Sequence, residues 1–320
     1  MPARAEARSP SASTIWGGLV IVYLFWGTTY FAIDRTNRSI PPLVGPAFRF
    51  IVAGAILMAL SKLRRGWRRT HPRGWAGATV VGVLLMFGGN GLVAVAEDLG
   101  VPTGIVALLI ALVPLWIALI DRVVLRSAPM GWRVAVGLAG GFLGAAYLVT
   151  GQLRGDVRPL GLAIAVIASL SWASGSLASR EVPLPPDALQ ASGMQQVAGG
   201  AVILLAAAVS GELGDLELSR VTAGSLLALA YLVVFGSLLT FSTYLWLLRN
   251  ARTSLVSTYA FVNPVVAVTL GWAFLDEPIT ARTLVAGGVI LVAVALIVSA
   301  GGAARSRSAQ RVETTEAEAR

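Results

Sequence analysis

Ten apolar runs divide this chain of 320 residues, and each is close to the length that a helix needs to cross a hydrocarbon core of ~30 Å. Hydrophobic residues make up 56% of the chain and charged residues only 13%, whereas a soluble domain has about a quarter of its residues charged. We therefore predict an all-α integral membrane protein with ten transmembrane helices. The predicted spans are 15–33, 43–63, 74–96, 104–120, 134–151, 161–178, 188–209, 223–248, 255–275 and 283–300.

The chain repeats its plan at about half its length. Segment 102–129 has Pro114 near its middle, and segment 252–279 has Pro264 near its middle. A shift of the sequence by 150 residues places Pro114 on Pro264. A chain of this kind is predicted to be built from two copies of one five-helix unit. The expected divisions are a disordered cytoplasmic N-terminus at 1–13, a first repeat at 14–151, a linker at 152–160, a second repeat at 161–300 and a cytoplasmic tail at 301–320.

The basic residues indicate how the helices are oriented. The net charge is +9, and Lys and Arg gather in alternate loops, most densely in segment 62–73. By the positive-inside rule this pattern predicts that both termini are cytoplasmic, in a multi-pass protein of the plasma or inner membrane. It also explains the positive charge without a nucleic-acid partner.

An odd number of helices in each unit means that the second copy must enter the membrane from the opposite side. The loops agree with this, because 62–73 is basic whereas its counterpart, 211–220, carries Glu212, Asp215 and Glu217. The predicted fold is therefore two inverted five-helix repeats, a design shared by many transporters.

Several kinds of chemistry lack the residues they need. The chain has no Cys and one His, so we expect no disulfide, no metal site and no catalytic group of the nucleophile–His–acid type. It also lacks the G-x-x-x-x-G-K-[ST] motif of ATP-binding proteins. We expect a protein that is not an enzyme and that binds no cofactor.

Five stretches, in order along residues 15–300, resemble the EamA branch of the drug/metabolite transporter superfamily. They are LFWGTTYFAI (24–33), PPLVGPAFRFIVAG (41–54), GNGLVAVAEDLGVPTGIVALLIALVPLW (89–116), SWASGSLASR (171–180) and SLVSTYAFVNPVVAVTLGWAFLDEP (254–278). The third stretch is most similar to YedA-type inner-membrane transporters. The resemblance implies ten helices, cytoplasmic termini, a central cavity between the halves, export of small metabolites such as amino acids, and no bound cofactor.

We expect the substrate cavity near the two prolines, because each should break or kink its helix and leave backbone carbonyls unpaired in mid-membrane. Packing kinks without a ligand remain an alternative, and Asn263 is expected chiefly to satisfy a freed backbone group. Aromatic and hydroxyl side chains complete the candidate set. The cavity candidates are Trp26, Thr29, Arg49, Asn90, Pro114, Trp172, Ser176, Tyr259, Asn263 and Pro264.

Two charged residues within or beside predicted spans have two interpretations each. Arg49 lies inside a span, where a charge is costly, and it is either a contact for a substrate carboxylate or an interhelical anchor that reaches toward the outer surface. Glu97 ends the third span and is either a proton-coupling group or a solvated carboxylate at a helix end.

These features predict a secondary transporter that exports small amphipathic or amino-acid-like metabolites by alternating access, with proton coupling left open. An uncoupled facilitator or channel is the main alternative. A lipid-modifying membrane enzyme is a remote one, since it would need clustered intramembrane acids or histidines. The expected partners are a small-molecule substrate and the lipid bilayer, and a homodimer is left open.

Overall fold

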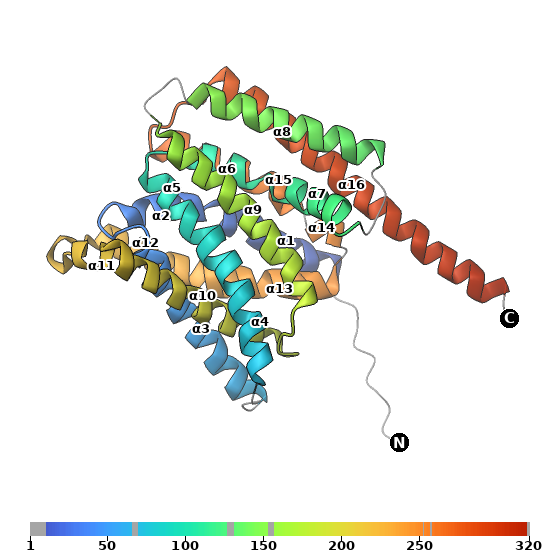
Figure 1. Ribbon diagram of the computed structural model, residues 1–320, viewed down its shortest axis with the longest axis horizontal. Helices are drawn as coiled ribbons and strands as arrows, with labels where there is room; N and C mark the ends of the chain where they lie inside the picture. The colour runs from blue at the N-terminus through green and yellow to red at the C-terminus, as the bar shows by residue number, and fades with distance from the viewer. Residues whose placement is uncertain are drawn as a thin grey trace.

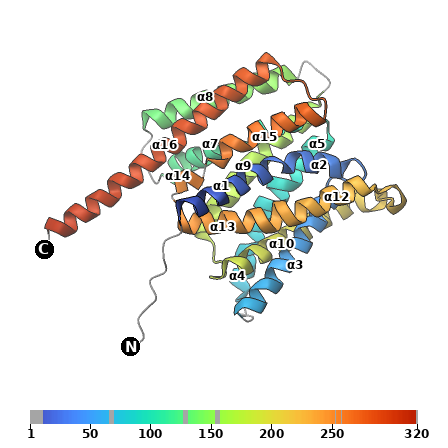
Figure 2. The same cartoon turned by 180° about the vertical axis from the view of Figure 1, so that it is seen from behind.

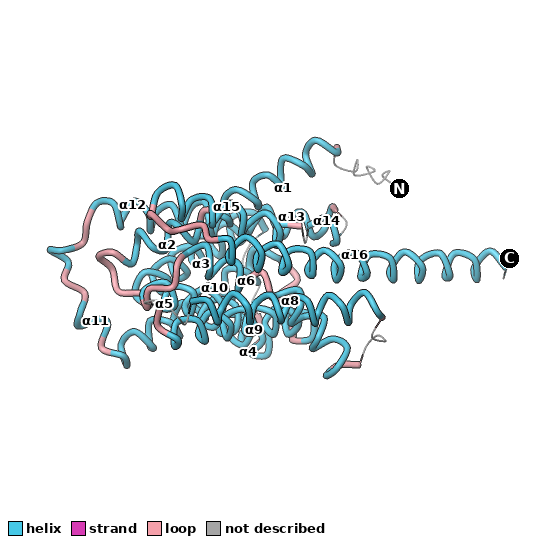
Figure 3. The backbone as a smooth tube through the Cα atoms, turned by 90° about the horizontal axis from the view of Figure 1, so that it is seen from above, coloured by secondary structure: helices cyan, strands magenta, loops and turns pink. Residues whose placement is uncertain are grey.

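The computed structural model describes residues 11–65, 70–126, 131–152, 157–251, 253–256 and 258–318, and within these ranges the regular secondary structure is entirely helical (Figure 1). The predicted disordered N-terminus lies outside the described residues at 1–10, and helix begins at Ala12. The predicted C-terminal tail continues the last helix to Glu318, so that this helix extends beyond the bundle (Figure 3).

The first half of the chain contains ten helical elements. They are α1 (Ala12–Gly27), α2 (Thr29–Asn37), α3 (Val44–Arg65), α4 (Pro72–Gly82), η1 (Val83–Gly91), α5 (Leu92–Asp98), α6 (Thr103–Ile110), α7 (Val113–Leu119), η2 (Ile120–Val124) and α8 (Trp132–Gln152).

The second half has the same kind of organisation. Its elements are α9 (Pro159–Glu181), α10 (Ala188–Ser210), α11 (Glu212–Asp215), η3 (Leu218–Arg220), α12 (Ala223–Tyr231), η4 (Leu232–Leu239), α13 (Thr240–Asn250), α14 (Thr253–Val256), α15 (Tyr259–Phe274) and α16 (Ala281–Glu318).

Nine helical stretches in the described part of the chain are long and apolar enough to cross a membrane. They are Ala12–Asn37, Val44–Arg64, Pro72–Asp98, Thr103–Val124, Trp132–Gln152, Pro159–Glu181, Ala188–Ser210, Ala223–Tyr244 and Ala281–Ser299. The remaining predicted span, 255–275, is divided between α14 and α15. Because α15 has 16 residues, it is about 24 Å long, less than the usual hydrocarbon thickness.

The two mid-membrane prolines have different effects. Pro114 has no N–H to bond the carbonyl of Ile110, and the chain turns there: α6 ends at Ile110 and α7 starts at Val113. Helix α15, in contrast, continues through Pro264, and the interruption precedes Tyr259. The expected break is thus found beside Pro114. In the second half the interruption lies before Tyr259 and not at Pro264.

Two π-helical segments interrupt the third and eighth predicted spans at corresponding places, since η4 begins 149 residues after η1 (232 against 83). In both segments a side chain donates to the backbone carbonyl five residues before it. The Asn90 amide donates to the Leu85 carbonyl at 3.2 Å, and the Thr240 hydroxyl donates to the Phe235 carbonyl at 2.6 Å. π-Helical segments are rare in proteins, and those that occur are often found at functional sites.

Small residues allow the helices to pack closely. Helices α3 and α10 lie side by side (Figures 1 and 2), and a Cβ atom added to Gly54 would lie 2.7 Å from the carbonyl oxygen of Gly193. Backbones this close gain dispersion contacts that lipid chains cannot supply equally well. Helices α8 and α16 form a second close pair on the opposite side of the bundle, with α1, α9, α13 and α15 between the two pairs (Figure 2).

Candidate functional site

A cavity of about 90 Å³ lies in the middle of the bundle, at the level where α1 gives way to α2 and α6 to α7. Its walls come from helices of both halves of the chain and are mostly apolar. The lining residues are Trp26, Thr29, Tyr30, Ile33, Arg49, Gly89, Asn90, Val93, Ala107, Ile110, Ala111, Val113, Pro114, Trp172, Tyr259, Ala260, Asn263 and Pro264.

Aromatic rings form one wall of this cavity. Trp26 and Trp172, from the two halves, meet edge to face with their ring centroids 6.5 Å apart, and Tyr259 meets Trp26 in the same manner at 5.1 Å. The Trp26 indole N–H also donates to the Gly236 carbonyl at 3.3 Å. Gly89 leaves room for this wall, because a Cβ atom there would lie 2.5 Å from the ring of Trp172.

Arg49 is the cation of the cavity. Its side chain is only 4% exposed, so it does not reach the outer surface as the anchor interpretation required. Its Nε donates to the Ser237 hydroxyl at 2.9 Å, and its guanidinium lies over the Phe50 ring at 4.7 Å. Within the described ranges no carboxylate lies within ion-pair distance of it. The positive charge is therefore buried beside the cavity without a carboxylate counter-ion among the residues that the structure describes.

The two asparagines of the cavity hold backbone rather than projecting freely. The Asn263 amide, in the orientation that satisfies it, donates to the carbonyls of Tyr259 and Tyr23 at 3.2 Å each. Neither acceptor is the carbonyl of Ala260, which is the one that Pro264 leaves without its helical N–H donor. Asn90 likewise donates to a backbone carbonyl, in η1, while also lining the cavity.

The structure brings together nine of the ten cavity candidates. The exception is Ser176, whose hydroxyl donates to the carbonyl of Trp172 in its own helix at 2.7 Å and which does not line the cavity. A serine in a helix interior commonly bonds the preceding turn in this way. Sequence reasoning did not single out Ser237, the partner of Arg49, or small wall residues such as Ala107, because nothing in their local sequence marks them.

Glu97 lies outside the cavity lining, nearer the end of the span. Its side chain is 8% exposed, and neither carboxylate oxygen has a hydrogen-bond partner among the residues that the structure describes. The expectation of a solvated carboxylate is therefore wrong. Two other acids, Asp34 and Glu277, are near enough to interact with it electrostatically.

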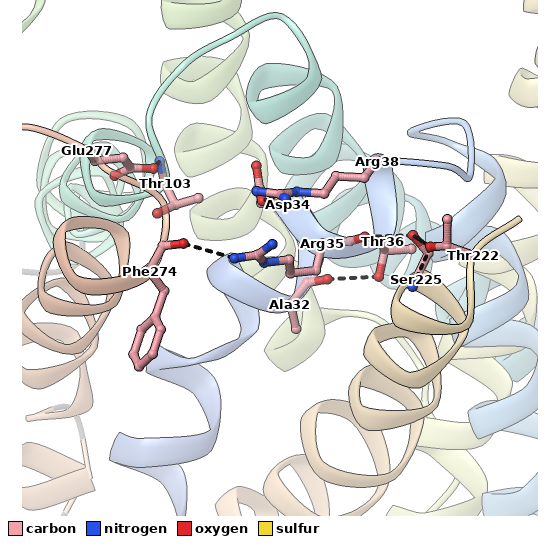
Figure 4. A network of polar contacts seen from close by, with 10 residues as sticks. All are labelled: Ala32, Asp34, Arg35, Thr36, Arg38, Thr103, Thr222, Ser225, Phe274 and Glu277. Carbon is pink, nitrogen blue, oxygen red and sulfur yellow. Dashed lines mark hydrogen bonds and ion pairs between the residues drawn. The ribbon is translucent and has the colours of Figure 1, made fainter.

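A network of polar contacts joins the two halves at this end of the bundle (Figure 4). Arg35 donates to the Phe274 carbonyl at 2.9 Å, and the Ser225 hydroxyl donates to the Arg35 carbonyl at 2.8 Å. The Glu277 carboxylate accepts from the backbone N–H of Thr103 at 2.6 Å. Nothing in the local sequence of Glu277 indicates this contact.

A further link lies outside the spans. Glu212, after α10, accepts a hydrogen bond from the backbone N–H of Leu43 at 2.8 Å. Burial raises the pKa of Glu212 above its ordinary value, and the hydrogen bond to Leu43 acts in the opposite direction.

At the other end of the bundle, hydrogen bonds also join the halves. Tyr23 is bonded to Thr258 through their hydroxyls, and the Ser61 hydroxyl donates to the Asp187 carboxylate. Cross-half contacts of this kind are thus present at both ends. In the ranges described, no group of three or more His, Cys, Asp or Glu residues is placed to hold a metal ion.

Comparison with known proteins agrees with this architecture. The chain matches the model of the EamA-like transporter family twice, over residues 14–150 and 159–299. A solved crystal structure covers 90% of this chain, and 98% of that chain is matched, with 21% identity and a TM-score of 0.60. At this identity the likeness concerns the fold alone.

Two curated relatives are similar over nearly their whole length. The inner membrane transporter YedA of Escherichia coli K12 is 37% identical over 286 residues, which cover 88% of this chain and 90% of YedA. Protein PecM of Dickeya dadantii is 30% identical over 281 residues, covering 85% and 88% of the two chains. With both halves matched by one family model, and with a helical membrane architecture, this chain belongs to the EamA-like transporter family.

Proposed function

We propose that this protein exports small amphipathic solutes bearing a carboxylate, amino acids and similar metabolites among them, across the inner membrane by alternating access. The observation that carries the proposal is the position of Arg49: a buried guanidinium without a carboxylate partner in the described residues, facing a cavity walled by aromatic rings.

A buried cation of this kind favours an anionic ligand. Leaving a charge inside the membrane without a partner is costly, and a carboxylate that enters the cavity supplies the missing counter-charge. Arginine is well suited to this task because its planar fork of N–H groups matches a carboxylate. The Ser237 hydroxyl and the Phe50 ring hold the guanidinium in place without neutralising it.

The aromatic wall favours solutes that also have an apolar part. Trp26, Trp172 and Tyr259 present rings, and the remaining wall is mainly aliphatic. The present space of about 90 Å³ is small beside the ~300–1,000 Å³ of a typical ligand pocket. A metabolite of ordinary size requires the walls to separate, as alternating access demands.

The two halves supply the parts for such a movement. We propose that they are inverted repeats with both termini cytoplasmic, which the odd helix number and the basic loops favour. The corresponding π segments η1 and η4 are consistent with two copies of one unit. Hydrogen bonds that join the halves at both ends, such as Arg35 to Phe274 and Tyr23 to Thr258, are contacts that can open alternately.

An uncoupled facilitator is the second candidate, and one observation favours it: the residues that line the cavity include no carboxylate. In the coupled version Glu97 takes up the proton from its buried position nearby. An imposed proton gradient distinguishes the two, because it drives net flux only in the coupled version.

The proposed function is tested by flux in proteoliposomes. Vesicles that contain the purified protein are loaded with a panel of labelled amino acids, or with analogues in which an amide replaces the carboxylate. We expect flux of carboxylate-bearing solutes, and a loss of at least tenfold in Arg49→Gln, while Arg133→Gln, which removes an exposed charge, transports normally. Equal transport of acids and amides by the wild type, or normal transport by Arg49→Gln, would contradict the proposal.

A further inference from the structure

A second and larger hollow, of about 320 Å³, lies away from the central cavity. It is a groove between the start of α6, the end of α8, the middle of α15 and the start of α16. One part of its wall is apolar, formed by Ile105, Val268 and Ile279. The other part is polar and includes Gln152 and Arg282.

Arg282 is the residue of this groove whose guanidinium has an N–H group without a hydrogen-bond partner among the described residues. Its Nε is buried and has no hydrogen-bond partner in the part of the chain that the structure describes. The guanidinium lies over the ring of Tyr147 at 4.3 Å, and no described carboxylate forms an ion pair with it. Glu277 also lines the groove, but its carboxylate is occupied by the backbone N–H groups of Thr103 and Gly104.

The groove lies where two spans end. Helix α8 ends at Gln152 and α16 starts at Ala281, so both spans reach their ends there. Leu284 and Val285, in the next turn of α16, are 62% and 57% exposed, as expected for side chains that face acyl chains. The groove thus presents a cation at the interface beside an apolar surface.

We propose that this groove binds an anionic phospholipid, with the phosphate on the guanidinium of Arg282 and an acyl chain along Ile105, Val268 and Ile279. A guanidinium recognises a phosphate through its planar fork of N–H groups, and the apolar wall beside it offers a surface for an acyl chain. A soluble anion would satisfy the guanidinium but would leave the apolar wall uncovered, which is why the lipid is favoured. The inference does not depend on which solute is transported.

The test uses the purified full-length protein in detergent and measures lipid binding by native mass spectrometry and by thermal unfolding. The probes are phosphatidylglycerol, phosphatidylcholine with the same acyl chains, and inorganic phosphate. Wild type is compared with Arg282→Gln and Arg282→Lys. Arg220→Gln is the matched control, because Arg220 is 78% exposed in its side chain and lies in a different loop.

We expect the wild type to prefer phosphatidylglycerol to phosphatidylcholine by about fivefold. The preference should disappear in Arg282→Gln and persist in Arg282→Lys and Arg220→Gln. An unchanged preference in Arg282→Gln would overturn the proposal. So would equal stabilisation by inorganic phosphate, which would make the ligand a soluble anion. The unfolding temperature without lipid shows whether each variant is folded. If Arg282→Gln does not fold, Arg282→Lys tests the proposal instead, and loss of the lipid preference in this variant, which keeps the positive charge, would contradict it.

Discussion

The carboxylate of Glu277 accepts a 2.6 Å hydrogen bond from the backbone N–H of Thr103, although the two residues are 174 positions apart. A second bond, from the N–H of Gly104, has a length of 3.1 Å. These N–H groups belong to the first turn of α6, which has no partners for them within the helix. Glu277 therefore caps a helix of the first half from a loop of the second half.

Replacing Glu277 by alanine should destabilise the folded protein by about 1–3 kcal/mol, because two poorly solvated N–H groups lose their acceptor. The measurement is thermal unfolding in a mild detergent. Glu217→Ala is the control: this residue is 51% exposed in its side chain and pairs with Arg220, so its loss should cost at most about 0.5 kcal/mol. Equal effects of the two substitutions would show that the contact with α6 is unimportant.

The sequence could predict the helical class and the positions of nine of the ten expected spans in the described residues, because long apolar runs have few alternatives in a membrane. It could not predict the cap on α6. Glu277 and Thr103 are brought together by tertiary packing, and their local sequences carry no sign of it. The same is true of Arg49 and Ser237, which are 188 positions apart.

Substituting Gly54 by alanine should destabilise the protein by about 1–3 kcal/mol, because the new Cβ atom would meet the Gly193 carbonyl at 2.7 Å. Gly140→Ala is the matched control, since a Cβ atom there meets nothing within 4 Å. That control should be neutral or stabilising by up to about 1 kcal/mol, as for any helical glycine. Unfolding temperatures of the two variants give the comparison, and a tolerated Gly54→Ala would mean that α3 and α10 can separate freely.

Trp172→Ala should raise the KM for the transported solute by about tenfold, equivalent to ~1.4 kcal/mol of binding, with little change in maximal flux. The reason is that Trp172 belongs to the aromatic wall of the cavity, where it meets Trp26 edge to face. Trp132→Ala, at a residue that is 69% exposed, should leave KM unchanged. Concentration-dependent uptake into proteoliposomes measures both, and a fall in maximal flux at constant KM would point to a structural role for Trp172.

Glu97→Gln should abolish the response of transport to a proton gradient while preserving exchange of solute across the membrane. The carboxyl is buried and free of hydrogen-bond partners in the described residues, so it can take up or release a proton without disrupting a bonded network. The experiment imposes a pH step on vesicles and compares net uptake with counterflow. A wild-type protein that ignores the pH step would favour the facilitator.

Only part of the candidate site could be predicted from the sequence. Pro114 could be predicted as a cavity residue because a proline inside an apolar run has a known effect on its helix, and Trp26 could be predicted only as one of several aromatic candidates. Ser176 was assigned to the cavity and lies outside it, because the five serines of α9 cannot be distinguished by their local sequence. The sequence left two interpretations of Glu97 open, because it could not show whether a carboxylate near the end of an apolar run is buried or solvated.

The π segment η1 changes the face of its span on which the residues after it lie, Glu97 among them. A π-helical turn holds more residues than the 3.6 of an α-helix, so one extra residue turns everything beyond it by about 100°. A helical wheel drawn through Pro72–Asp98 as one regular helix therefore assigns the residues after Gly91 to the wrong side of the span. The same offset applies after η4, so cysteine-accessibility scans of these two spans should be phased separately on either side of each π segment.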